Sequence, residues 1–125
     1  MKGVDHIGIA VSDLEASNKL FEALLNTKCY KIENIPDQKV LTSFFKTRDQ
    51  KIELVAATDS SSPISKFIDK KGEGIHHIAF EVRTYKQKLI VCKKKDFNPL
   101  VRNLQREQTT NSLFFFILKQ PMGYL

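Results

Sequence analysis

The sequence has only two cysteines and no apolar run long enough to cross a membrane, and each shortage excludes a class of protein. A transmembrane helix needs roughly 20 consecutive apolar residues. Cys29 and Cys92 lack the close spacing of zinc ligands, so we expect two reduced thiols rather than a disulfide framework or a structural metal site. The chain opens directly on Val4, Asp5 and His6, without a basic and then apolar leader, which predicts an untargeted, cytoplasmic protein.

Several catalytic motifs are also missing from the sequence. It contains no nucleophile elbow, no glycine-rich phosphate loop and no Cys–His pair at motif spacing. We therefore expect no covalent catalysis.

Acidic residues are scarce in the last third of the chain. Residues 83–125 contain 2 Asp or Glu against 9 Lys or Arg, whereas residues 1–82 contain 12 against 11. Nucleic-acid-binding surfaces interleave basic side chains with exposed aromatic residues or glycines. Lys93, Lys94 and Lys95 instead form one short run beside apolar positions, which is typical of a solvated helix end. We predict no nucleic-acid partner.

Apolar periodicity predicts strands and helices in alternation. Apolar residues recur at helical spacing after Ser12, which with Glu15 fits a capping box, so we expect an amphipathic helix over residues 13–26. Pro63 suits the first turn of a short second helix that ends near Lys71. Runs rich in β-branched and aromatic residues predict strands over residues 4–11, 28–34, 39–46, 50–56 and 77–82.

Two hexapeptides indicate that the pattern occurs twice. Residues 6–11 are HIGIAV and residues 77–82 are HIAFEV, both His-Ile-x-x-x-Val and 71 residues apart. After the second copy we expect another helix around residues 85–92 and strands near residues 97–101 and 112–118. A repeat of this length indicates a duplicated strand–helix–three-strand module.

We therefore predict an α+β fold in one domain over residues 1–125. Module 1 covers about residues 1–57, a linker and short helix cover 58–73, and module 2 covers about 74–125. Neither module has enough apolar surface to be stable alone. Together they form one curved mixed sheet around a central cleft, which is where ligands usually bind.

The histidines are the first candidates for chemistry. His6 and His77 occupy equivalent positions in the two repeats, and imidazole is a common ligand of zinc, cobalt, nickel and iron. His76 is adjacent to His77 and should point to the opposite face of its strand. The alternative is that these are ordinary core or surface histidines. Asp5 is either a partner of the His6 ring or a solvated carboxylate.

Glu53 is the most informative carboxylate. Its neighbours Ile52 and Leu54 are apolar and share one face of the predicted strand, so Glu53 lies on the other face with Lys51 and Val55. A carboxylate in that position is either solvated or bound to a cation. The residues alone leave both interpretations open.

Four segments together resemble the methylmalonyl-CoA epimerase family of the vicinal oxygen chelate superfamily, which includes glyoxalases and bleomycin-resistance proteins. The match is dense between residues 4 and 82. The Ser-Pro-Ile-x-x-Phe segment and the paired histidines are its most specific features. The four segments are VDHIGIAVSDLEA from Val4, KIEL from Lys51, SPISKF from Ser62 and GEGIHHIAFEV from Gly72.

The resemblance implies a tandem βαβββ fold of glyoxalase type and one divalent metal ion. By motif, the metal ligands would be His6, Glu53 and His77, and the metal would be cobalt, or else zinc, nickel or manganese. It implies an isomerase that interconverts the two epimers of methylmalonyl-CoA through a metal-stabilised enolate, with an acyl-CoA substrate and, by analogy, a homodimer. No general base is assigned, although Glu53 is a possible catalytic residue.

Two other functions remain open at this stage. One is another metal-dependent enzyme of the superfamily, such as a glyoxalase I-like lyase (lactoylglutathione lyase) or a dioxygenase. The other is a metal-free ligand-binding protein of the bleomycin-resistance type. Substrate and bound metal distinguish these functions.

The C-terminal tail departs from the family pattern. The family has a fourth ligand, a glutamate on the last strand, and residues 118–125 supply none. With suitable codons, the same tail read one base earlier gives Pro-Lys-Thr-Thr-Asn-Gly-Val-Leu, which fits the family. We hypothesise that the tail over residues 101–125 is a frameshifted reading of an epimerase gene, with activity impaired; a diverged tail whose missing ligand is replaced by water is the alternative. Codons incompatible with the shifted reading would disprove the frameshift.

Overall fold

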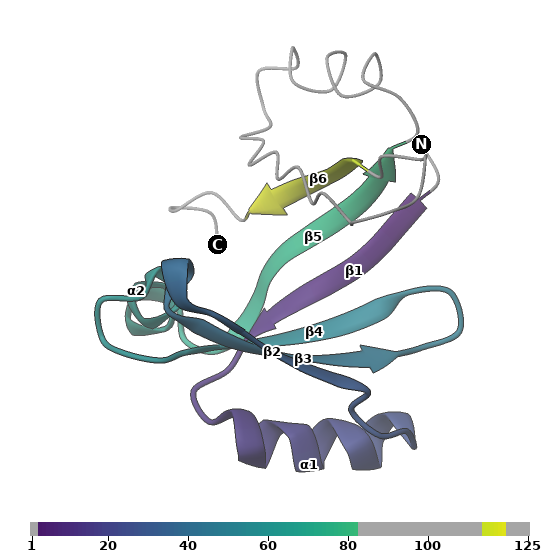
Figure 1. Cartoon of the computed structure of the whole chain (residues 1–125), viewed down its shortest axis with the longest axis horizontal. Helices are drawn as coiled ribbons and strands as arrows, with labels where there is room; N and C mark the ends of the chain where they lie inside the picture. The colour runs from purple at the N-terminus through teal and green to yellow at the C-terminus, as the bar shows by residue number, and fades with distance from the viewer. Residues whose placement is uncertain (1–2, 83–113, 120–125) are drawn as a thin grey trace. The chain divides into compact units, whose positions relative to one another are not determined.

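The computed structural model describes residues 3–82 and 114–119, and the chain divides into two compact units. One unit is Ile7–His76; the other is Met1–His6 together with His77–Leu125. The strands β1 (Gly3–Ala10) and β5 (Gly74–Val82) each contain residues of both units. Figure 1 labels the elements used below.

The unit Ile7–His76 contains the helix–strand succession predicted for the first repeat. After β1 come the helix α1, three strands and the helix α2, and the strand order within this unit is β2-β3-β4-β1. A 3₁₀ helix lies between β2 and β3. The bounds are α1 Leu14–Leu25, β2 Lys31–Ile35, 3₁₀ helix Pro36–Gln38, β3 Val40–Lys46, β4 Lys51–Ala57 and α2 Pro63–Lys71.

The antiparallel ladder of β2, β3 and β4 has one helix on each face. Side chains alternate along a strand, so each face collects every second residue. Phe45 and Leu54, both 0% exposed, pack on α1 through a cluster that includes Phe21. Val40 and Val55 lie in a second cluster with Ile64 and Phe67 of α2. The two clusters keep the strands in register and thereby determine the face on which each polar side chain lies.

The start of α1 differs from the sequence prediction. Asp13, not Ser12, is the N-cap, because its carboxylate accepts a hydrogen bond from the backbone N–H of Ala16 at 3.1 Å. The backbone N–H of Ser12 instead donates to the carboxylate of Glu73 at 2.7 Å. Asn26 ends the helix in the left-handed conformation, with φ 50°.

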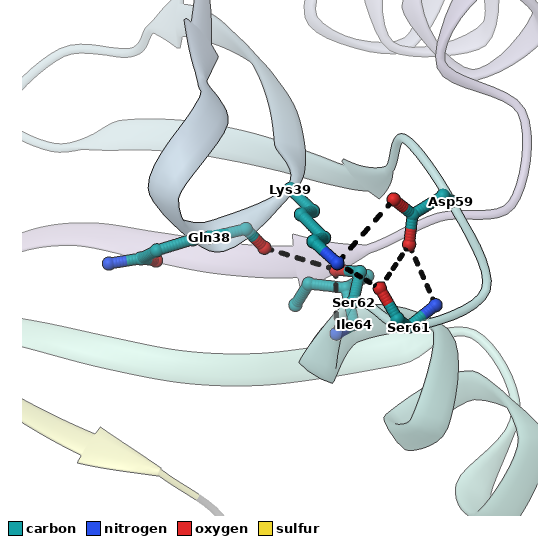
Figure 2. A network of polar contacts seen from close by, with 6 residues as sticks. All are labelled: Gln38, Lys39, Asp59, Ser61, Ser62 and Ile64. Carbon is teal, nitrogen blue, oxygen red and sulfur yellow. Dashed lines mark hydrogen bonds and ion pairs between the residues drawn. The ribbon is translucent and has the colours of Figure 1, made fainter.

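A polar network fixes the start of α2 (Figure 2). Asp59 accepts hydrogen bonds from the backbone N–H of Ser61 at 2.7 Å and from its hydroxyl at 2.5 Å. The ammonium of Lys39 donates to the Ser61 hydroxyl and lies 3.8 Å from the Asp59 carboxylate. Ser62 caps the helix by accepting from the N–H of Ile64 at 3.3 Å. The polar segment before Pro63 is thus a turn, within the stretch predicted as a linker.

The second unit contains part of the second repeat. Its strand order is β1-β5-β6, and β6 (Phe114–Lys119) is antiparallel to β5, with His77 opposite Lys119. β6 confirms the strand expected near residues 112–118. The helix expected around residues 85–92 and the strand near 97–101 lie outside the described residues. The single-domain boundaries and module limits stay predictions.

Within the described residues, the element order and strand arrangement confirm the predicted α+β class. Within residues 3–82 and 114–119, no helix is long and apolar enough to span a membrane.

Candidate metal centre

The imidazole rings of His6 and His77 meet within one unit. Nε2 of His6, on β1, lies 3.2 Å from Nε2 of His77, on β5. The ring centroids are 5.2 Å apart and the rings are nearly perpendicular, at 89°. Two nitrogens bound tetrahedrally to zinc at 2.0–2.1 Å would lie roughly 3.3 Å apart. The observed separation is therefore suitable for two ligands of one metal ion.

Asp5 orients the His6 ring. Its Oδ2 lies 2.8 Å from Nδ1 of His6, and the two side chains are 16% and 11% exposed. A carboxylate there favours the tautomer with the proton on Nδ1, which leaves the lone pair on Nε2. Nε2 of His6 then accepts a hydrogen bond from Nε2–H of His77. Of the two roles left open for Asp5, partner of the His6 ring or solvated carboxylate, the structure shows the first.

Glu53 lies on β4, in the unit Ile7–His76. It is half-buried and opposite Phe44 in the antiparallel register. Its neighbours Ile52 and Leu54 belong to the cluster under α1, so Glu53 lies on the other face, as strand alternation predicted. The carboxylate is therefore placed away from the α1 core.

His76 and His77 have different partners. The His76 ring contacts the Phe67 ring edge-to-face, with centroids 4.9 Å apart. Within its own unit, His77 contacts His6. This difference confirms that the adjacent histidines point to opposite faces, and His76 belongs to packing around α2.

The prediction of two reduced thiols is tested for one of the two cysteines. Cys29 is a free, half-buried thiol that donates to the carbonyl of Lys31 at 3.2 Å. Cys92 lies outside the described residues, as does most of the tail in which the fourth ligand was sought.

Residues 5–116 match the Glyoxalase/Bleomycin resistance protein/Dioxygenase superfamily, and the chain belongs to this superfamily. Among its relatives, the methylmalonyl-CoA epimerase, mitochondrial, of Mus musculus is 30% identical over 98 residues, which are 78% of this chain and 55% of the relative. The uncharacterized protein YqjC of Bacillus subtilis (strain 168) is 39% identical over 80 residues, or 64% of this chain and 57% of YqjC. The chain thus spans little more than half the length of these two relatives.

A solved structure gives the same family. The methylmalonyl-CoA epimerase of Streptomyces coelicolor, in complex with 2-nitronate-propionyl-CoA, superposes with a TM-score of 0.73 at 27% identity. The match covers 94% of this chain and 87% of that one. The resemblance stated from the four sequence segments is therefore confirmed at the level of the family.

Proposed function

We propose that this protein is a metal-dependent isomerase that interconverts the two epimers of methylmalonyl-CoA. The observation that supports it most is the 3.2 Å approach of the two Nε2 atoms of His6 and His77. Two imidazoles aimed at one point, with a carboxylate behind one of them, suit a divalent cation. The epimerase relatives supply the substrate class.

Three residues of the chain would bind the metal: His6, Glu53 and His77. Each offers one ligand atom, an imidazole nitrogen or a carboxylate oxygen. This donor set suits cobalt, our first choice, and equally zinc, nickel or manganese. A divalent metal bound there would polarise the thioester carbonyl of the substrate and stabilise negative charge on its oxygen.

The chain's own residues would perform supporting tasks. Asp5 holds the His6 ring so that the Nε2 lone pair faces the ligand position. Glu53 is a metal ligand in this proposal, and a carboxylate that accepts the α-proton is the alternative role for the same side chain. A cytoplasmic location and a homodimer belong to the same proposal.

The test is α-proton exchange. The full chain, loaded with cobalt, is incubated with methylmalonyl-CoA in deuterated water, and loss of the α-proton signal is followed by NMR. We expect exchange well above that of His77→Ala, and His76→Ala serves as the matched control because the adjacent ring lies on the other face.

Two results would contradict the proposal that this protein is an epimerase. Cobalt binding without α-proton exchange would favour a glyoxalase I-like lyase or a dioxygenase, to be tested with a glutathione hemithioacetal or a catechol. Failure to retain cobalt after dialysis would favour a metal-free binding protein of the bleomycin-resistance type. Cobalt retention is read from its visible absorption, so it is independent of turnover.

A further inference from the structure

A hydrogen bond within the unit Ile7–His76 joins the ends of two neighbouring strands. β1 ends at Ala10, and the backbone N–H of Ser12 donates to Oε1 of Glu73 at 2.7 Å. Glu73 directly precedes β5, which is the neighbour of β1 in the strand order. The bond spans 61 residues of sequence. It therefore ties the end of the strand of the first hexapeptide to the start of the strand of the second.

The backbone on both sides of Glu73 is glycine. Gly72 ends α2 with φ 75°, a conformation that other residues rarely adopt, and Gly74 begins β5. Glycine loses more conformational freedom on folding than any other residue, so the preferences of such a loop do little to fix its path. The carboxylate of Glu73 supplies a restraint from outside the loop, because it is bonded to the residue before the N-cap of α1.

The same two strands contain the proposed histidine ligands. His77 follows Glu73 by four residues on β5, and His6 precedes Ser12 by six residues on β1. In the other unit, Nε2 of His6 lies 3.2 Å from Nε2 of His77. The pair of strands is thus joined by side chains at two places, once within each unit.

The adjacent histidine makes the register of β5 decisive. A shift of a strand by one residue turns every side chain to the opposite face. Such a shift of β5 would bring His76, in place of His77, to the face that His6 occupies. In the structure His76 packs instead on the ring of Phe67, with centroids 4.9 Å apart. Both histidines offer the same ligand atoms, so the register determines which of them meets His6.

We propose that Glu73 is a positioning residue, which sets the register of β5 through its hydrogen bond with Ser12 and thereby selects His77 over His76 as the partner of His6. Glu73 acts through the backbone of the strand and is not itself a ligand. The consequence for metal binding rests on the proposed function. The consequence for the contact of the two rings does not, because that contact is present without a metal.

The first test uses the full chain without metal. Glu73→Ala removes the acceptor, whereas Glu73→Gln keeps an oxygen that accepts from the N–H of Ser12. NMR measures amide hydrogen exchange at Ser12 and the nuclear Overhauser effect between the rings of His6 and His77. Glu73→Ala should speed the exchange and abolish the Overhauser effect, and Glu73→Gln should largely preserve both. The control Glu33→Ala removes a glutamate from β2 and should change neither.

The second test measures cobalt affinity by competition with a chelator. Glu73→Ala should lower the affinity about tenfold, which is the factor expected for one hydrogen bond to a charged group, and Glu73→Gln should lower it less. His76→Ala then separates selection from general loosening. It should leave cobalt affinity unchanged in the natural sequence and lower it further in Glu73→Ala, because a shifted β5 presents His76 to the metal.

The outcomes separate this inference from the metal and epimerase proposals. An unchanged Overhauser effect in Glu73→Ala, or the same effect of His76→Ala in both backgrounds, would overturn the role of Glu73. An Overhauser effect lost in Glu73→Ala and kept in Glu73→Gln, in a chain that does not retain cobalt, would overturn the metal site and support the register role. Thermal unfolding shows whether each variant is folded. Glu73→Asp, whose side chain is one methylene shorter, gives the same tests if Glu73→Ala does not fold.

Discussion

Oδ2 of Asp5 lies 2.8 Å from Nδ1 of His6, on the side of the ring away from His77. Carboxylates in this position fix the ring and raise its basicity as a ligand, and removing one typically lowers metal affinity roughly 10–100-fold. Asp5→Ala should therefore weaken cobalt binding by about that factor, and Asp5→Asn, which can still accept a hydrogen bond, by less.

Cobalt affinity measured by competition with a chelator checks this prediction. Asp37→Ala, which removes an exposed carboxylate from the 3₁₀ helix, is the matched control. Equal cobalt affinity in Asp5→Ala and Asp37→Ala would show that Asp5 does not support the metal ligand.

The two adjacent histidines should behave differently when each is replaced by alanine. His77→Ala removes a proposed ligand, so cobalt binding should be lost while the protein stays folded. His76→Ala removes an edge-to-face contact with Phe67, so it should retain cobalt and lose about 0.5–1.5 kcal/mol of stability. Cobalt absorption and urea unfolding of both variants test the pair. Retained cobalt in His77→Ala would contradict the ligand assignment.

The sequence predicted most elements of the described chain because the periodicity is strong there. The bounds of α2 match the prediction, and α1 and β4 match within about one residue. The predicted N-cap of α1 was wrong because the side chains of Ser12 and Asp13 are both suited to capping a helix. The contact that engages Ser12 comes from Glu73, 61 residues away, so local sequence patterns alone do not distinguish the two.

The candidate metal centre was also predicted only in part. The repeat placed His6 and His77 in equivalent positions, and their rings lie in contact. The role of Asp5 stayed open because adjacent strand residues normally point to opposite faces. A short side chain nevertheless reaches the ring of the next residue here, which is a matter of side-chain torsion that a residue pattern does not encode.

The core between α1 and the ladder should tolerate truncation poorly. Leu54 is 0% exposed and packs in the cluster that includes Phe45 and Phe21. Leu54→Ala should cost about 2–5 kcal/mol of unfolding free energy, through lost burial and the cavity left behind. Leu24→Ala, at a position 70% exposed on α1, should change stability by less than about 0.5 kcal/mol. Chemical denaturation of the two variants measures this difference in stability. Equal denaturation midpoints would contradict this packing.

The turn before α2 should make a pH-dependent contribution to stability. The pKa of Asp59 is lowered from its ordinary value of 3.8, first by the hydrogen bond from the Ser61 side chain and then by the Ser61 backbone N–H, with a smaller effect of Lys39. A carboxyl whose pKa is lower in the folded chain stabilises the fold above its unfolded pKa, and that stabilisation is lost as pH falls through the folded value.

Asp59→Asn should therefore be less stable than the natural sequence at neutral pH, and the difference should shrink as the pH falls below 3.8. The measurement is the urea midpoint at several pH values, because the carboxyl is exposed and the effect is small. Asp37→Asn removes the same charge from the surface and controls for net charge. A difference between Asp59→Asn and the natural sequence that stays constant from neutral to acidic pH would mean that the ionised carboxylate does not stabilise the turn shown in Figure 2.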